Sequence, residues 1–232
     1  MSAHMNLDAV DVDGAVRDAA EAVSGDSRLS FLRKVGIAGG SVLGGGALLG
    51  ALVPNALAAA SSGRPPSSFG AGDVGILNYA LTLEYLEANF YAQAVANIKF
   101  SDSHLAALAK VIAGHEAAHV AYLKAALGSK AVKQPSFDFG AAVKSESTFT
   151  KTSQVLENTG VGAYFGQAFN ISVPADLKAA VSILTIEARH AGAIGYYNDP
   201  TAKAVSPNGA FDKPLTASTV LAAVTATKFI VS

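Results

Sequence analysis

The sequence predicts an all-α protein whose main domain is a four-helix bundle with one long crossover. Apolar residues recur with a period near that of an α-helix over four long segments after residue 72. Glycine, proline and capping residues separate these segments. The first and third connections are short and the second is long. This pattern predicts two antiparallel helical hairpins joined by a connection that runs the length of the bundle.

Each element has its own boundary signals. Ser101 or Ser103 is expected to cap the second helix, and Gly128 is expected to end it. Ser172 is expected to cap the fourth helix, with Pro174 in its first turn. The four helices are expected over residues 73–98, 104–127, 148–169 and 172–197, and a short C-terminal helix is expected within 216–231.

The N-terminal part has the order of an export signal. A basic cluster ends at Lys34, a glycine-rich apolar stretch without charge follows, and Ala56–Ala58 supplies an A-x-A cleavage site. The seven glycines between Gly36 and Gly50 argue against a stable membrane helix. We therefore expect a signal-like segment over 1–58, a linker over 59–72 and the bundle domain over 73–232. The protein is then periplasmic or extracellular, or tethered to the membrane if the signal is retained.

Composition narrows the kinds of site. The net charge of −1 gives no reason to expect a nucleic-acid partner. The absence of cysteine excludes disulfides, thiolate metal sites and iron–sulfur clusters. The two methionines, Met1 and Met5, lie before the bundle, which argues against methionine-ligated haem. The remaining candidate metal ligands are carboxylate and imidazole groups.

Two Glu-x-x-His motifs supply such groups. Glu116 and His119 lie on the second expected helix, and Glu187 and His190 lie on the fourth. Residues three apart on a helix share one face, so each pair can reach the same metal site. One such motif is common by chance, but two on alternate helices indicate a shared centre.

The other two helices supply further acids at matching distances. Glu84 precedes Glu116 by 32 residues, and Glu157 precedes Glu187 by 30 residues. In antiparallel hairpins this spacing brings all four glutamates to a similar height. It also favours Glu84 over the nearby Glu87 as a ligand.

Burying four glutamates together requires compensating positive charge. Two divalent ions would supply it, and mixed carboxylate and imidazole ligands suit iron or manganese, with zinc as a further candidate.

This arrangement resembles the ferritin-like di-iron or di-manganese superfamily. The segments LNYALTLEYLEANFY, HEAAHVAYL, VLENTGVGAYFGQA and NGAFDKPLT are similar, more narrowly, to exported ferritin-like domain proteins that include the desiccation-related proteins. The segment SRLSFLRK resembles the twin-arginine export motif, with Leu29 in place of its second arginine. The ferritin-like resemblance implies that Glu116 and Glu157, or their counterparts, bridge two metals. The full ligand set that it implies is Glu84, Glu116, His119, Glu157, Glu187 and His190.

Four neighbouring residues have open roles. Tyr91 and Tyr164 each follow a predicted ligand by seven residues, so they are core aromatics, hydrogen-bond partners of ligands or redox-active groups. His115 is expected to contact the site from outside or to face solvent. Glu87 is expected to be a surface acid or a spare carboxylate, with a place in the ligand set as the less favoured alternative.

Three classes of function remain. The first is a redox enzyme that acts on dioxygen, peroxide or ferrous iron, such as an oxidase, ferroxidase or manganese catalase. The second is a non-enzymatic, exported metal-binding or stress-protective protein. The third is a structural surface protein whose ligand set is vestigial. Metal ions are the expected partners in the first two cases, and a homo-oligomer is left open.

Overall fold

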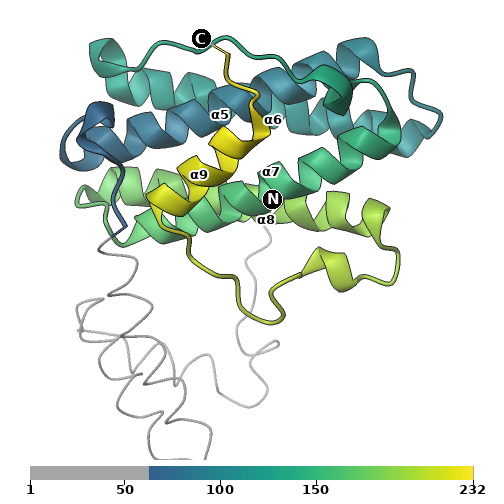
Figure 1. Ribbon diagram of the computed structural model, residues 1–232. Helices are drawn as coiled ribbons and strands as arrows, with labels where there is room; N and C mark the ends of the chain where they lie inside the picture. Colours follow the sequence, from purple (N-terminus) through teal and green to yellow (C-terminus); the bar gives the residue numbers. More distant parts are fainter. Residues whose placement is uncertain (1–62, 232) are drawn as a thin grey trace, which may run out of the picture. The chain divides into compact units, whose positions relative to one another are not determined.

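The computed structural model describes residues 63–231, and apart from one isolated bridge the regular structure in this range is helical. Four long helices form the bundle and a shorter one follows (Figure 1). The predicted fold class is therefore confirmed. The helices are α5 (Gly72–Asn97), α6 (Ser103–Leu127), α7 (Glu146–Ala168), α8 (Pro174–Asn198) and α9 (Ala217–Thr227).

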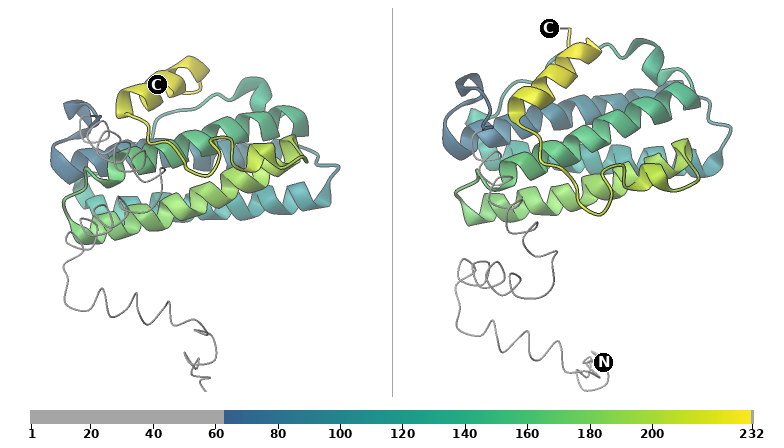
Figure 2. Two further views of the ribbon diagram at one scale, coloured as in Figure 1. Left: turned by 90° about the horizontal axis from the view of Figure 1, so that it is seen from below. Right: turned by 60° about the horizontal axis from the view of Figure 1, so that its bottom comes forward.

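The long helices pack as two hairpins. α5 packs along α6, and α7 packs along α8. The crossover from α6 to α7 spans residues 128–145 and contains two 3-10 turns, Gly128–Lys130 and Gly140–Val143. It returns the chain along the bundle, so that α7 begins at the end where α6 begins (Figures 1 and 2).

Two of the predicted helix caps were wrong. Asp102, rather than either neighbouring serine, caps α6 and accepts hydrogen bonds from the backbone N–H of His104 at 2.7 Å and of Leu105 at 3.1 Å. Ser172 does not cap α8. The Asp73 carboxylate at the start of α5 instead accepts from the backbone N–H groups of Ser172 and Val173. Asp73 thus satisfies the N–H of Val173, the N-cap residue, and that of Ser172 before it, whereas a capping serine would accept from an N–H inside the first turn.

The core is divided along the bundle axis. One apolar cluster is rich in aromatic side chains, and Phe90, Phe139 and Phe149 lie at its centre. A second, mostly aliphatic cluster surrounds Leu81 and Leu123 towards the other end. The buried glutamates lie between the two clusters, so the bundle holds its polar residues in a dry environment.

The C-terminal segment covers the bundle from outside. α9 packs against α7, and the backbone N–H of Leu215 donates to the carbonyl of Gly162 at 2.9 Å. A Cβ at Gly166 would lie 1.9 Å from the Leu215 carbonyl oxygen, so this contact requires glycine. An isolated antiparallel bridge joins Phe137 of the crossover to Ile230.

The predicted export signal over 1–58 lies outside the described residues. Of the predicted linker, residues 63–72 are described and contain the 3-10 turn Ser67–Phe69. Within the described part of the chain, no helix is long and apolar enough to cross a membrane.

Candidate metal centre

The structure brings all six predicted ligands together in the middle of the bundle. Each long helix contributes at least one ligand, and all four glutamates are 0% exposed. At this depth the carboxylates have no access to bulk water, so their charge must be balanced locally. The residues are Glu84 from α5, Glu116 and His119 from α6, Glu157 from α7, and Glu187 and His190 from α8.

These side chains form two overlapping groups, within each of which the ligand atoms lie within 4.8 Å of one another. Glu84 and His119 belong to the first group alone, and Glu157 and His190 belong to the second alone. Glu116 and Glu187 belong to both. Such sharing is the arrangement needed for two neighbouring ions with two bridging carboxylates.

The shared pair differs from the expected pair of Glu116 and Glu157. The sequence repeat explains the difference. Glu116 and Glu187 occupy equivalent places in the two halves of the bundle, each at the head of a Glu-x-x-His motif. A centre that treats the two halves alike must bridge through equivalent residues, and Glu157 is instead the equivalent of Glu84.

The first group surrounds one imidazole nitrogen with three carboxylate oxygens. His119 Nδ1 lies 3.2 Å from Glu84 Oε2, 3.3 Å from Glu116 Oε2 and 3.2 Å from Glu187 Oε1. A single ring N–H cannot donate well to three acceptors at once. A cation between these atoms would satisfy all of them.

The second group contains polar atoms without hydrogen bonds. His190 Nδ1 lies 3.0 Å from Glu116 Oε1 and 3.3 Å from Glu157 Oε2, yet none of these atoms has a hydrogen-bond partner among residues 63–231. The atoms are close but do not point directly at one another. Because buried polar atoms are rarely left unsatisfied, this convergence fits a metal ion.

The pKa values in the metal-free protein reflect this crowding. Burial lowers the pKa of His119, but its close contacts with the carboxylates of Glu116, Glu187 and Glu84 outweigh it and raise the pKa to about 12. The same balance of burial against carboxylate contacts raises the pKa of His190 to about 10. Without metal, protonated histidines therefore take over part of the charge balance.

The pKa values of the carboxyl groups shift in both directions. Burial raises the pKa of Glu116, but the hydrogen bond with His119 and the close contact with His190 reverse the effect and hold it at about 2. Burial and neighbouring carboxylates raise the pKa of Glu84 and Glu187 well above the ordinary value. Glu116 is thus the most strongly ionised member of the metal-free cluster.

Each of the two tyrosines donates a hydrogen bond to a glutamate on the other's helix. The Tyr91 hydroxyl of α5 donates to Glu157 of α7, and the Tyr164 hydroxyl of α7 donates to Glu84 of α5. Each tyrosine therefore positions the glutamate of the opposite helix rather than the one seven residues before it. Of the roles left open by the sequence, the structure gives both tyrosines that of a hydrogen-bond partner of a predicted ligand.

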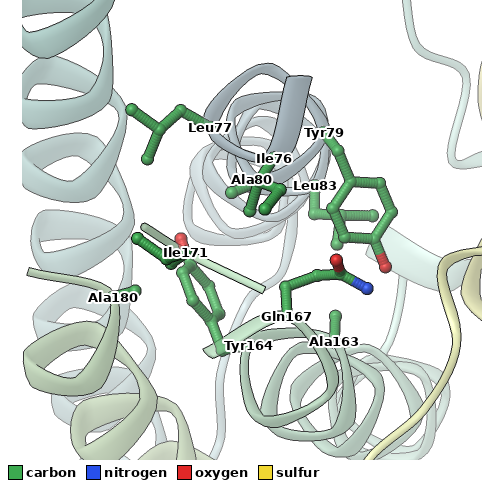
Figure 3. A pocket seen from close by; sticks show the side chains of 10 residues that line it. All are labelled: Ile76, Leu77, Tyr79, Ala80, Leu83, Ala163, Tyr164, Gln167, Ile171 and Ala180. Carbon is green, nitrogen blue, oxygen red and sulfur yellow. The ribbon is translucent and has the colours of Figure 1, made fainter. Parts of the chain in front are cut away.

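Tyr164 also borders a small apolar cavity of about 10 Å³ (Figure 3). This volume approaches that of one water molecule. The Tyr79 ring and the Gln167 side chain lie on the opposite side of the cavity in this view. The hydroxyl of Tyr79 is buried and has no hydrogen-bond partner in the described part of the chain.

His115 contacts the site from outside. Its Nδ1 lies 2.9 Å from Nε2 of His190, and the two rings are stacked with centroids 5.2 Å apart. His190 thus presents Nδ1 to the carboxylates and Nε2 to His115. Sequence reasoning kept His115 out of the ligand set but missed this bond, because it joins α6 to α8.

Glu87 lies closer to the centre than the sequence suggested. It is only 3% exposed, although it belongs to neither ligand group. It follows Glu84 by three residues, so the helical spacing that linked each Glu-x-x-His pair was the signal that could have identified it. Of the roles expected for it, the structure excludes a surface acid.

One side of the centre approaches the protein surface. A groove of about 570 Å³ lies between α6 and α8, and His119 forms part of its floor. Apolar side chains such as Ile183 and Ile186 line the groove, together with Tyr122 and Lys178. The groove brings the His119 side of the centre close to the protein surface.

Comparison with known proteins agrees with this architecture. Residues 72–198, more than half of the chain, match the family described as the ferritin-like domain. No curated protein matched the sequence. The matched range begins with α5 and ends with α8, so it contains all six clustered residues. Together, the bundle topology, the buried glutamate and histidine cluster and this match show that the chain belongs to the ferritin-like family.

Proposed function

We propose that this protein binds two divalent metal ions, iron or manganese, and uses them for redox chemistry on dioxygen, peroxide or ferrous iron. The observation that carries the proposal is the pair of buried ligand groups sharing Glu116 and Glu187. Bound iron or manganese would supply a redox-active Lewis acid that binds and polarises an oxygen species. Zinc suits the same ligands but supplies no redox chemistry.

The chain's own residues support this role in three ways. The apolar clusters on either side keep bulk water from the centre, which strengthens electrostatic interactions there. Tyr91 and Tyr164 hold Glu157 and Glu84 in place through hydrogen bonds. The groove that reaches His119 offers a route for a small oxygen-containing substrate.

Removing shared and unshared ligands should have different effects. The double variant Glu116→Ala/Glu187→Ala is expected to bind no metal, because it removes a ligand pair from both positions. His119→Ala is expected to lose one metal and His190→Ala the other. Elemental analysis after metal loading and desalting measures this stoichiometry. Two ions retained by the double variant would refute the assignment.

The main alternative is a non-enzymatic metal-binding or stress-protective protein. The depth of the ligands favours this alternative, since only His119 approaches the surface groove. Assays of ferrous oxidation and peroxide decomposition on the metal-loaded protein separate the two functions. Turnover that is lost in the Glu116→Ala/Glu187→Ala variant supports the enzyme, and two bound metals without turnover support the alternative.

We also propose that the protein works outside the cytoplasm. The support is the basic, apolar and A-x-A order of residues 28–58. Protein purified from its native host is expected to begin at Ala59. Its intact mass measures this directly, and a full-length chain in the cytosolic fraction would contradict export.

A further inference from the structure

Glu87 is a buried acid without a partner. It lies on α5 one helical turn beyond Glu84 and is 3% exposed. It makes no hydrogen bond or ion pair with any residue in the range 63–231. A carboxylate in this position would be costly to bury unless something compensates its charge. Burial and the neighbouring glutamates raise the pKa of Glu87 well above its ordinary value, so a proton neutralises it in the metal-free protein, and a bound cation could take the place of that proton.

Gly160 of α7 creates the space in front of this acid. A Cβ at Gly160 would lie 3.2 Å from Glu187 Oε2 and 3.4 Å from Glu87 Oε1. Both carboxylates therefore lie next to the position on α7 where Gly160 has no side chain. Glu187 Oε2 is fully buried and has no hydrogen-bond partner in the described part of the chain. Glu87 thus faces the unsatisfied side of a ligand that both metal positions share.

We propose that Glu87 is a seventh protein ligand, which enters the coordination shell of the metal pair beside Glu187 through the space left by Gly160. The inference rests on the proposed dinuclear function and adds a residue to it. The three heavy atoms nearest to a Cβ at Gly160 are all carboxylate oxygens of Glu187 and Glu87.

The negative charge of Glu87 affects which metal oxidation state the site prefers. The four glutamates of the two groups carry four negative charges, which two divalent ions balance. Ionised Glu87 adds a fifth negative charge, and a pair with one trivalent ion restores neutrality. Glu87 therefore favours metals with an accessible trivalent state, iron and manganese, over zinc. It also favours the oxidised form of the pair over the reduced form.

The test compares the wild-type protein with Glu87→Gln, which keeps the shape of the side chain and removes its charge. Both proteins are loaded with ferrous iron, and metal affinity and the ferric/ferrous midpoint potential are measured by spectroelectrochemical titration. We expect Glu87→Gln still to bind two ions, with an affinity that is lower by about tenfold at most. Its potential is expected to rise by about 59 mV for each tenfold loss of preference for the ferric state.

Two further variants control for fold and for charge at a distance. Gly160→Ala keeps every charge but fills the space, so it is expected to raise the potential as Glu87→Gln does. Asp176→Asn removes one half-buried charge from the first turn of α8 and is expected to leave the potential unchanged. Thermal unfolding of the metal-free proteins should show Glu87→Gln at least as stable as wild type, because a buried unpaired acid is lost.

The outcomes separate this inference from the proposed function. Two bound ions with the same affinity and potential in wild type and Glu87→Gln would overturn the role of Glu87 and leave the dinuclear centre standing. A wild-type protein that binds no metal would overturn the proposed function itself. A raised potential in Glu87→Gln and Gly160→Ala, but not in Asp176→Asn, would support the seventh ligand.

Discussion

The two histidines of the centre differ in the contacts that their ring nitrogens make. The ring of His190 meets His115 through Nε2, whereas His119 makes hydrogen bonds through Nδ1 alone and borders the surface groove. A metal-bound imidazole is oriented by the partner of its other nitrogen. The two proposed metal positions are therefore unequal, since the His190 ring is held by His115 whereas His119 borders the surface groove.

This asymmetry predicts a selective effect of His115→Ala. With Nδ1 of His190 on a metal, its Nε2–H must donate, and His115 Nδ1 is the acceptor at 2.9 Å. Losing it should weaken binding at the His190 position by about 10- to 100-fold and spare the His119 position. Calorimetric titration with manganese can resolve the two steps. Ile186→Ala is the matched control, because Ile186 precedes Glu187 as His115 precedes Glu116.

The tyrosines offer a second prediction. In the metal-free protein, Tyr91→Phe and Tyr164→Phe each leave a buried carboxyl group without its hydroxyl donor. Each change should lower the free energy of unfolding by about 1–3 kcal/mol. Urea denaturation in the presence of a chelator measures it. Tyr79→Phe is the control, since that buried hydroxyl has no partner among residues 63–231. An equal loss in all three variants would show that the hydroxyl bonds are not responsible.

At the scale of elements, the sequence predicted the helices well and their contacts less well. Periodicity and the breaks between segments located all four long helices to within a few residues, although α5 and α7 are buried on most sides and only α6 and α8 bury mainly one face. Spacing within a helix likewise grouped each Glu-x-x-His pair. The bond from His115 to His190 and the cap that Asp73 provides for α8 depend on how helices are rotated and stacked. Single-helix patterns do not contain that information.

The link between α5 and α8 predicts the effect of Asp73→Ala. This carboxylate accepts the backbone N–H groups of Ser172 and Val173, which no local side chain satisfies. Its loss should cost about 1 kcal/mol, as for a lost N-cap, with no change in the denaturant slope. Asp212→Ala, in an exposed loop, removes the same group without a hydrogen bond and should be neutral. Equal effects of the two variants would disprove the capping role.

At the scale of the whole molecule, the buried centre couples folding to metal and to protons. The metal-free fold must bury four carboxylates between two apolar clusters. Protons can neutralise the cluster, but metals compete with them because ligands bind in the deprotonated form. The stability of the bundle should therefore depend on pH in opposite ways with and without metal.

The sign follows from the pKa shifts. A group whose pKa is higher in the folded state stabilises the fold below its unfolded pKa, and this contribution is lost as pH rises through the folded pKa. For His190 the window runs from the ordinary value of 6.5 to about 10. The contributions of Glu84 and Glu187 begin to fade above the ordinary value of 4.5. Glu116, with a pKa of about 2, has the opposite effect only below 4.5.

Metal-free protein should thus lose stability as pH rises from about 5 to 9, while metal affinity increases because fewer protons must be displaced. The difference in melting temperature between protein in excess manganese and protein in chelator should widen over this range. At free metal about 100-fold above the dissociation constant, each ion should add about 2.7 kcal/mol. The Glu116→Ala/Glu187→Ala variant should show no difference at any pH. A difference that narrows with rising pH would mean that the metals do not displace protons from this cluster, and would place them elsewhere.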